Sequence, residues 1–139
     1  MAATSSKGGL KPPFHPDSDV HITYEDQQKI NRFARLNAKL EDYKDDIKSK
    51  ENDLQSIEEA CEEIELFDDD EQIPYLVGEA FIYQNVEKTQ SCLADAKKNL
   101  ENDIKDLKEK VSGVKEKMGE LKIYLYGKFG NHIHLETDE

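Results

Sequence analysis

The chain has no tryptophan, only two cysteines and only four prolines among its 139 residues. Two cysteines cannot supply a disulfide framework, so packing rather than covalent cross-links has to hold the fold. No run approaches the roughly 18 apolar residues of a membrane span, and the N-terminal segment has no signal-peptide core. We therefore expect a soluble cytoplasmic protein, with the nucleus as a second possible compartment.

Basic residues are also scarce. The chain has 19 lysines and arginines against 31 aspartates and glutamates, which gives a net charge of −12. Proteins that bind nucleic acids normally present a basic patch, and an anionic membrane repels a surface of this sign. We expect neither a nucleic-acid partner nor a membrane partner.

Sequence motifs of enzymes are missing as well. The chain has no glycine-rich phosphate loop, no GxSxG and no Walker sequence, so we expect neither enzymatic turnover nor a cofactor. Asp68, Asp70 and Gln72, with Glu79 at the twelfth position, resemble a calcium loop. The sixth position of such a loop requires glycine, and here it is Ile73, which favours a solvated acidic turn.

The remaining metal-ligating residue types also lack the required spacing. His132 and His134 have no obvious third ligand near them in the sequence, so no metal site is predicted. Cys61 falls in an apolar register and Cys92 lies one place before a register position. We interpret both cysteines as small, reduced apolar side chains, with metal binding or redox chemistry as the alternative.

What the sequence does contain is two long stretches with a seven-residue apolar repeat, in which most apolar residues are alternately three and four apart. The first comprises Phe33, Leu36, Leu40, Tyr43, Ile47, Lys50, Leu54, Ile57, Cys61 and Ile64, with Lys50 as its polar member. The second comprises Val86, Leu93, Leu100, Ile104, Leu107, Val111, Val114, Met118, Leu121 and Leu125. This spacing, kept over four or five heptads, is typical of a coiled coil.

The two stretches are predicted to pair antiparallel, because one register matches their apolar positions throughout. It places Ile64 opposite Val86, Ile47 opposite Ile104 and Phe33 opposite Met118. Charge agrees, since residues 24–66 hold 13 acids and 7 bases (net −6) and residues 86–128 hold 8 acids and 10 bases (net +2). Opposite charges on the two stretches favour their pairing over self-association of the first.

Capping residues and breaks in the pattern define the segments. Thr23 is a good N-cap, and Asp26 stands where a capping box normally has Glu or Gln. Residues 73–83 are rich in β-branched and aromatic side chains around Gly78-Glu79, which predicts a hairpin with strands near 73–77 and 80–83.

The predicted segments are a flexible arm (1–22), a coiled-coil unit (23–130) and a mostly loose tail that ends acidic (131–139). The coiled-coil unit is made of a helix (24–66), the hairpin (73–83) and a second helix (86–127). The predicted fold class is mainly α: a long antiparallel two-helix coiled coil with one β-hairpin inserted between the helices.

The hairpin is the first candidate site. A two-stranded hairpin is marginally stable alone, and this one has two open edges and many large apolar side chains. We expect several subunits to assemble through it, with a hairpin folded down on its own coil as the alternative. The candidate oligomerisation residues are Ile73, Tyr75, Leu76, Val77, Gly78, Phe81, Ile82 and Tyr83.

The helix ends far from the hairpin are the second candidate site. Apolar and aromatic residues are dense there, where a two-helix coil must fray. They predict an adaptable surface that binds exposed apolar segments of another protein, with plain core packing as the alternative. The candidate residues are Ile30, Phe33, Leu36, Met118, Leu121, Tyr124, Leu125, Tyr126 and Phe129.

Over about residues 20–136 the chain resembles prefoldin, and within that family a β-type subunit. The parts that carry the resemblance are Thr23–Asn31, Phe33-Ala34-Arg35, Asp68-Asp69-Asp70, Ile73-Pro74-Tyr75, Val77-Gly78, Phe81-Ile82 and Leu125–Gly130. Their order, with a single hairpin between two helices, fits the β type, whereas α-type subunits carry two hairpins.

The resemblance implies a heterohexameric co-chaperone in which this chain joins two α-type and three further β-type subunits. It implies that the hairpins form a platform of β-barrels and that coiled-coil tips hold nonnative proteins, notably actin and tubulin. It also implies delivery of these clients to the cytosolic chaperonin without ATP. A structural coiled-coil scaffold or tethering subunit is the alternative function, and a calcium-dependent regulator is a weaker one.

Overall fold

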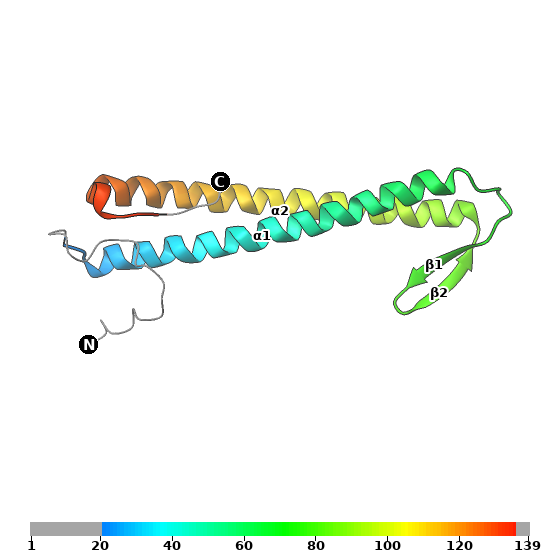
Figure 1. Cartoon of the computed structure of the whole chain (residues 1–139), viewed down its shortest axis with the longest axis horizontal. Coiled ribbons are helices and arrows are strands. Elements are labelled where there is room, and N and C mark those ends of the chain that lie inside the picture. Colours follow the sequence, from blue (N-terminus) through cyan, green and yellow to red (C-terminus); the bar gives the residue numbers. More distant parts are fainter. Residues whose placement is uncertain (1–20, 136–139) are drawn as a thin grey trace. The chain divides into compact units, whose positions relative to one another are not determined.

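The computed structural model describes residues 21–135 of the chain. Within that range, α1 (Tyr24–Ile64) and α2 (Val86–Phe129) are separated by the strands β1 (Ile73–Val77) and β2 (Ala80–Gln84), and a 3-10 turn, η2 (Gly130–His132), follows α2 (Figure 1). The two strands form one antiparallel sheet. The fold class predicted from the sequence is confirmed. The predicted arm lies almost entirely in residues 1–20, outside the described residues.

The chain divides into two compact units, and both helices contribute to each of them. One, which we call the hairpin unit, comprises residues 43–110. The other, which we call the end unit, comprises residues 1–42 and 111–139, of which 21–42 and 111–135 are described.

The predicted apolar positions of both helices face inward. Each register residue named above is buried or half-buried. In the hairpin unit, Ile64 and Val86 share one buried cluster with Ile73 and Leu93, as the antiparallel register requires. Ion pairs from Lys97 to Glu58 and from Lys108 to Glu51 (both 3.6 Å) join the two helices beside this seam. Such partly exposed pairs contribute little stability, but they agree with the orientation.

Both helices begin at the residues that cap them. The Asp26 amide donates to Thr23 Oγ1 (3.0 Å) and the Thr23 amide donates to Asp26 Oδ2 (3.1 Å), so the predicted box is confirmed with aspartate in the glutamate position. Asn85 caps α2, because its Oδ1 accepts the Lys88 amide at 2.8 Å. The Thr89 hydroxyl donates to the Asn85 carbonyl at 2.9 Å and strengthens the same turn.

Each helix ends about two residues from its predicted end. α1 stops at Ile64, because the Leu66 and Phe67 amides turn back to the Glu63 and Ile64 carbonyls (3.1 and 3.0 Å), three residues earlier instead of four. α2 continues through Gly127 to Phe129. The glycine that terminates it is Gly130, whose φ of +57° is the left-handed conformation that commonly follows a helix end.

The hairpin has the predicted position and turn, with β2 extended by one residue. Val77 pairs with Ala80, so Gly78-Glu79 form a two-residue loop, and Ile73 pairs with Gln84 at the other end. Gly78 has φ +63°, the glycine-favouring conformation at the first loop position of a tight hairpin.

The segment after α2 folds back and is buried, whereas the sequence predicted a loose tail. The side chains of Ile133 and Leu135 are 3% and 7% exposed. The Leu135 amide donates to the Tyr126 hydroxyl (3.1 Å), and this hydroxyl donates to the Leu135 carbonyl (3.4 Å). The prediction of a loose tail is therefore wrong for residues 133–135, because three residues are too few to show a period in the sequence. Residues 136–139 lie outside the described range.

The two glycines Gly78 and Gly113 give a matched test of this backbone. Gly78→Ala should lower the free energy of unfolding by about 1 kcal/mol, because a side chain is disfavoured at positive φ. Gly113→Ala should raise it by about 1 kcal/mol, because Gly113 lies inside α2 with open space around it. Urea unfolding followed by circular dichroism measures both variants. Shifts in the same direction would contradict the turn geometry.

Candidate functional site

The hairpin has one face toward its own unit and one face toward solvent. Residues paired directly across the strands share a face, so Ile73, Tyr75 and Gln84 lie on one side. Ile73 and Tyr75 pack into the buried cluster of the hairpin unit, and Gln84 is buried. The opposite side, which we call the outer hairpin face, comprises Pro74, Leu76, Phe81 and Tyr83, all exposed.

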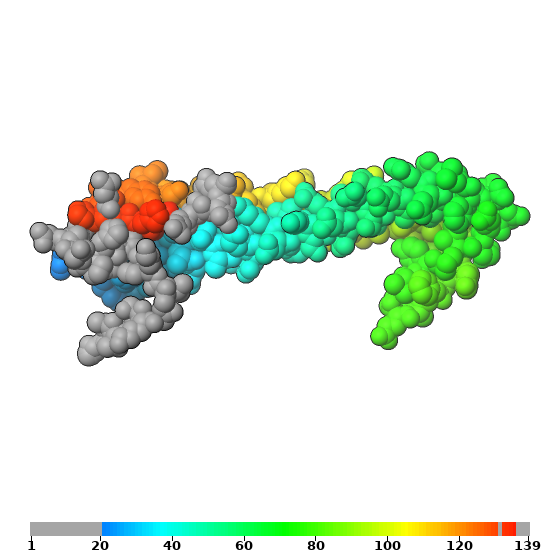
Figure 2. Space-filling model, viewed as in Figure 1, coloured from blue at the N-terminus to red at the C-terminus, as the bar shows by residue number. Residues whose placement is uncertain are grey.

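The outer hairpin face is a strongly apolar surface. Leu76, Phe81 and Tyr83 are among the exposed large hydrophobic residues of the chain. Val77 and Ile82 lie on the opposite side, near the loop, and are exposed as well. Burial of each such side chain is worth about 1.5–3 kcal/mol, and both strands have an open edge. Figure 2 shows the green hairpin standing out from its unit. Of the predicted oligomerisation residues, only Ile73 is buried and only Tyr75 is half-buried.

The two cysteines lie beside the base of the hairpin and are not joined to each other. Cys61 packs against the buried cluster of the hairpin unit. Cys92 Sγ accepts a weak hydrogen bond from Gln84 Nε2 at 3.8 Å. Both act as half-buried small side chains in this structure.

The predicted residues at the helix ends divide into a core and a surface. Ile30, Phe33, Met118, Leu125 and Phe129 are buried, Leu36 and Leu121 are half-buried, and Tyr124 and Tyr126 are exposed. The buried members pack within the end unit, whereas the exposed members face solvent.

Two exposed residues at this end were not among the predicted ones. Tyr24 is 78% exposed and Ile123 is 77% exposed. Both fall outside the heptad register, and this is the signal that would have identified them, because an apolar residue off the seam of a two-helix coil must face water. We call Tyr24, Ile123, Tyr124 and Tyr126 the tip surface.

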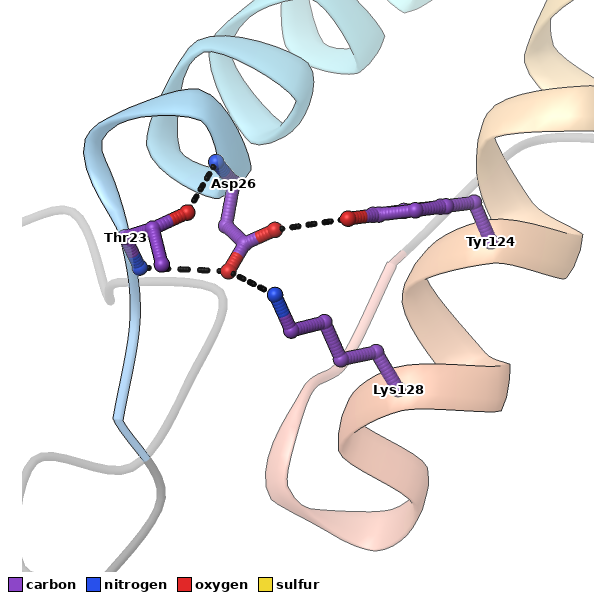
Figure 3. Close-up of polar contacts among 4 residues, drawn as sticks. All are labelled: Thr23, Asp26, Tyr124 and Lys128. Atoms are coloured by element: carbon purple, nitrogen blue, oxygen red, sulfur yellow. Dashed lines mark hydrogen bonds and ion pairs between the residues drawn. The ribbon is translucent and has the colours of Figure 1, made fainter.

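One buried carboxylate links the start of α1 to the end of α2. Asp26 is 0% exposed and accepts hydrogen bonds from the Thr23 amide (3.1 Å), the Tyr124 hydroxyl (3.1 Å) and Lys128 Nζ (2.7 Å) (Figure 3). We call Thr23, Asp26, Tyr124 and Lys128 the Asp26 clasp. Lys29 Nζ lies 4.9 Å from the centre of the Tyr124 ring and adds a cation–π contact.

The clasp keeps its carboxylate ionised. Burial by itself raises the pKa of Asp26, because desolvation disfavours the charged form. The hydrogen bonds from Lys128, Thr23 and Tyr124 outweigh burial and hold the pKa of Asp26 well below its ordinary value. The hydrogen bond to Asp26 raises the pKa of Lys128 in turn. A charge-assisted pair therefore persists across the neutral range.

The clasp fixes the part of the coil where two helices would otherwise separate. Asp26 completes the capping box of α1 with Thr23, and it also holds the Tyr124 ring of the tip surface through the Tyr124 hydroxyl. From the sequence, Asp26 is predicted only as part of the capping box, and not as a partner of Tyr124 and Lys128. Its position opposite Tyr124 in the predicted antiparallel register, with Lys128 one turn further along α2, was the available signal for the second role.

Charge is divided unevenly between the two units. Residues 43–110 hold 20 acids and 9 bases (net −11). Residues 21–42 and 111–135 together hold 6 acids and 8 bases (net +2). The helix ends are therefore slightly basic in a chain that is acidic overall.

Neither a membrane-spanning helix nor a metal-ligand cluster is found in residues 21–135. No helix there is long and apolar enough to cross a bilayer. No group of three or more His, Cys, Asp and Glu side chains gathers there as a metal site. That range includes the acidic segment 68–79 as well as His132 and His134.

Asp26→Asn tests the clasp through its pH dependence. The folded pKa of Asp26 is lowered, so its stabilisation is present above the ordinary carboxyl pKa of about 4 and is lost as pH falls below it. At pH 7 the variant should be less stable by about 1–2 kcal/mol. The difference from the parent should shrink between pH 5 and pH 2. Thermal unfolding followed by tyrosine near-UV circular dichroism measures it, with the exposed Asp45→Asn as control. A difference that is constant with pH would contradict the assignment.

Comparison with known proteins agrees with this architecture. Residues 27–132 match the family described as prefoldin subunit. The chain is 48% identical over 139 residues to a probable prefoldin subunit 4 of Drosophila melanogaster, with 100% of both chains covered. It is 44% identical over 140 residues to prefoldin subunit 4 of Homo sapiens, covering 100% of this chain and 99% of the human one.

A solved structure shares the fold. The prefoldin beta subunit from Thermococcus strain KS-1 superimposes with a TM-score of 0.69 at 20% identity, covering 77% of this chain and 94% of that chain. At this identity the likeness concerns the fold, and the full-length relatives carry the family assignment. The chain therefore belongs to the prefoldin subunit family, with subunit 4 as the member that these relatives represent, and it is a component of a protein-folding co-chaperone.

Proposed function

We propose that this subunit joins its sister subunits through the outer hairpin face and holds nonnative proteins at the tip surface. One observation carries the proposal: the exposed large apolar side chains gather mainly at two places, the hairpin (Leu76 to Tyr83) and the helix ends (Tyr24 and Ile123 to Tyr126). These places belong to different units of the chain.

Assembly through the hairpin is supported by the two open strand edges as well as by the apolar face. Edge pairing satisfies backbone groups, and face-to-face packing removes Leu76, Phe81 and Tyr83 from water. Membership in the family implies assembly with other prefoldin subunits. We propose two α-type and three further β-type partners, in the cytoplasm.

Client holding is supported by the chemistry of the tip surface. Tyr124 and Tyr126 present aromatic rings, Ile123 presents an aliphatic side chain, and Lys29 and Lys128 lie over the Tyr124 ring. Such a surface contacts exposed apolar segments weakly, and several tips around one client raise the affinity through effective concentration. We propose nonnative actin and tubulin as clients, passed to the cytosolic chaperonin as the weak contacts exchange, without ATP.

Assembly is tested by Leu76→Ser combined with Phe81→Ser. Both changes remove apolar area from the outer hairpin face and leave the buried cluster of the hairpin unit intact. Native mass spectrometry after co-expression with the other subunits should show loss of this chain from the six-chain complex. Leu66→Ser is the matched control, because Leu66 is 85% exposed in the same unit but not on that face. Full incorporation of the double variant would overturn the assembly surface.

Client holding is tested by Tyr24→Ser combined with Ile123→Ser in the reconstituted complex. Light scattering of chemically unfolded actin reports how much complex prevents aggregation. The concentration for half-suppression should rise on the order of threefold, because one tip of several is weakened. Leu66→Ser should leave it unchanged. An unchanged value for the double variant would overturn the tip surface as a client site, and would favour a subunit that serves as a scaffold and does not itself hold clients.

A further inference from the structure

The last described residues form an extended strap beside the end of α2. Gly130 reverses the chain with φ +57°, and η2 carries it to Ile133, which is extended with φ −127° and ψ 146°. Figure 1 shows this segment doubling back from the end of α2 and running alongside it. We call residues 133–135 the strap.

The Tyr126 side chain contacts the strap through the backbone of Leu135. The Tyr126 hydroxyl accepts a hydrogen bond from the Leu135 amide at 3.1 Å and donates one to the Leu135 carbonyl at 3.4 Å. Every residue except proline has both of these backbone groups, so a hydroxyl in this position recognises an extended chain without regard to its sequence. Tyr126 is itself a member of the tip surface.

The strap also shows which side chains the end unit accepts. Ile133 and Leu135 are buried, whereas His134 between them is exposed. This alternation is the period of an extended strand, in which every second side chain points the same way. The end unit therefore buries two aliphatic side chains two residues apart on a main chain that Tyr126 anchors.

We propose that the place filled by the strap is a binding site for an extended client segment with aliphatic side chains two residues apart, and that the strap competes with clients for it. The inference rests on the proposed function, because it specifies which client chemistry the same end of the coil recognises. An unfolded protein offers such segments frequently, since extended β-forming stretches alternate in this way.

Charge adds a preference to this site. Glu136, Asp138 and Glu139 follow the strap in the sequence, and the end unit has a net charge of +2 over its described residues. An aliphatic pair followed by acidic residues is therefore the favoured ligand, and its binding should weaken as salt is added.

Competition follows from the short connection. The strap starts four residues after the end of α2, and a short tether gives an effective concentration on the order of millimolar. A ligand in solution then binds only the fraction of molecules in which the strap is displaced, which lowers its apparent affinity by that fraction.

The test uses a fluorescent peptide with the sequence of residues 131–139 and the full-length chain. Ile133→Ser combined with Leu135→Ser should bind the peptide at least about tenfold more tightly than the parent, because the internal competitor is removed. A peptide with both aliphatic residues replaced by serine should not bind. Adding Tyr126→Phe to the double variant should abolish most of the gain, because both hydrogen bonds to the backbone are lost. Equal affinity of parent and double variant, or undiminished binding by the triple variant, would overturn the proposal.

Two further measurements keep the outcome unambiguous. If circular dichroism shows that the double variant loses helix, Leu135→Ala is used instead, with an expected gain in peptide affinity of about threefold. No gain would again overturn the proposal.

The aggregation assay separates this inference from the proposed function. If the strap variants behave like the parent while Tyr24→Ser with Ile123→Ser suppresses aggregation less, the competition is refuted and client holding stands. If the peptide binds as expected and that tip variant suppresses normally, client holding at the tip surface is refuted instead.

Discussion

A single narrow seam between two helices is the constraint on which this molecule depends. A two-helix coil buries one stripe on each helix, so an apolar residue off that stripe faces water. Leu40 and Leu125 lie on the seam and are almost fully buried, whereas Ile123, two residues before Leu125, is exposed. In the hairpin unit a small buried cluster takes up one side of the hairpin and leaves the outer hairpin face exposed. Both apolar surfaces of the chain are therefore consequences of how little a pair of helices can enclose.

Apolar packing along the seam is supplemented by polar contacts where α1 begins and α2 ends. Asp26 serves as capping partner of Thr23, as acceptor for Lys128 and as acceptor for Tyr124. Removing a carboxylate from water is unfavourable unless its oxygens are satisfied, and here three donors satisfy them. The exposed aromatic ring of Tyr124 is thus attached to a fixed support, as the proposed client-holding surface requires.

The sequence predicted the parts of this structure that rest on period and local chemistry. Heptads identified both helices and their antiparallel pairing, Thr23 and Asp26 identified the helix start, and Gly78 identified the turn. The sequence did not predict the features that depend on contacts between distant segments. The second role of Asp26 requires Lys128, which is 102 residues away, and the burial of Ile133 and Leu135 requires a chain reversal at Gly130. A local break in hydrogen bonding, rather than a change in periodicity, ended α1 at Ile64.

The uneven charge of the two units bears on how sister chains sort themselves. Two copies of this chain meeting hairpin to hairpin would each bring a region of net charge −11, and at physiological salt such charges repel over about 8 Å. A neighbour with a less acidic hairpin region meets a smaller barrier. If sister subunits meet at the outer hairpin face as proposed, like-charge repulsion works against an assembly of identical copies and in favour of a mixed one.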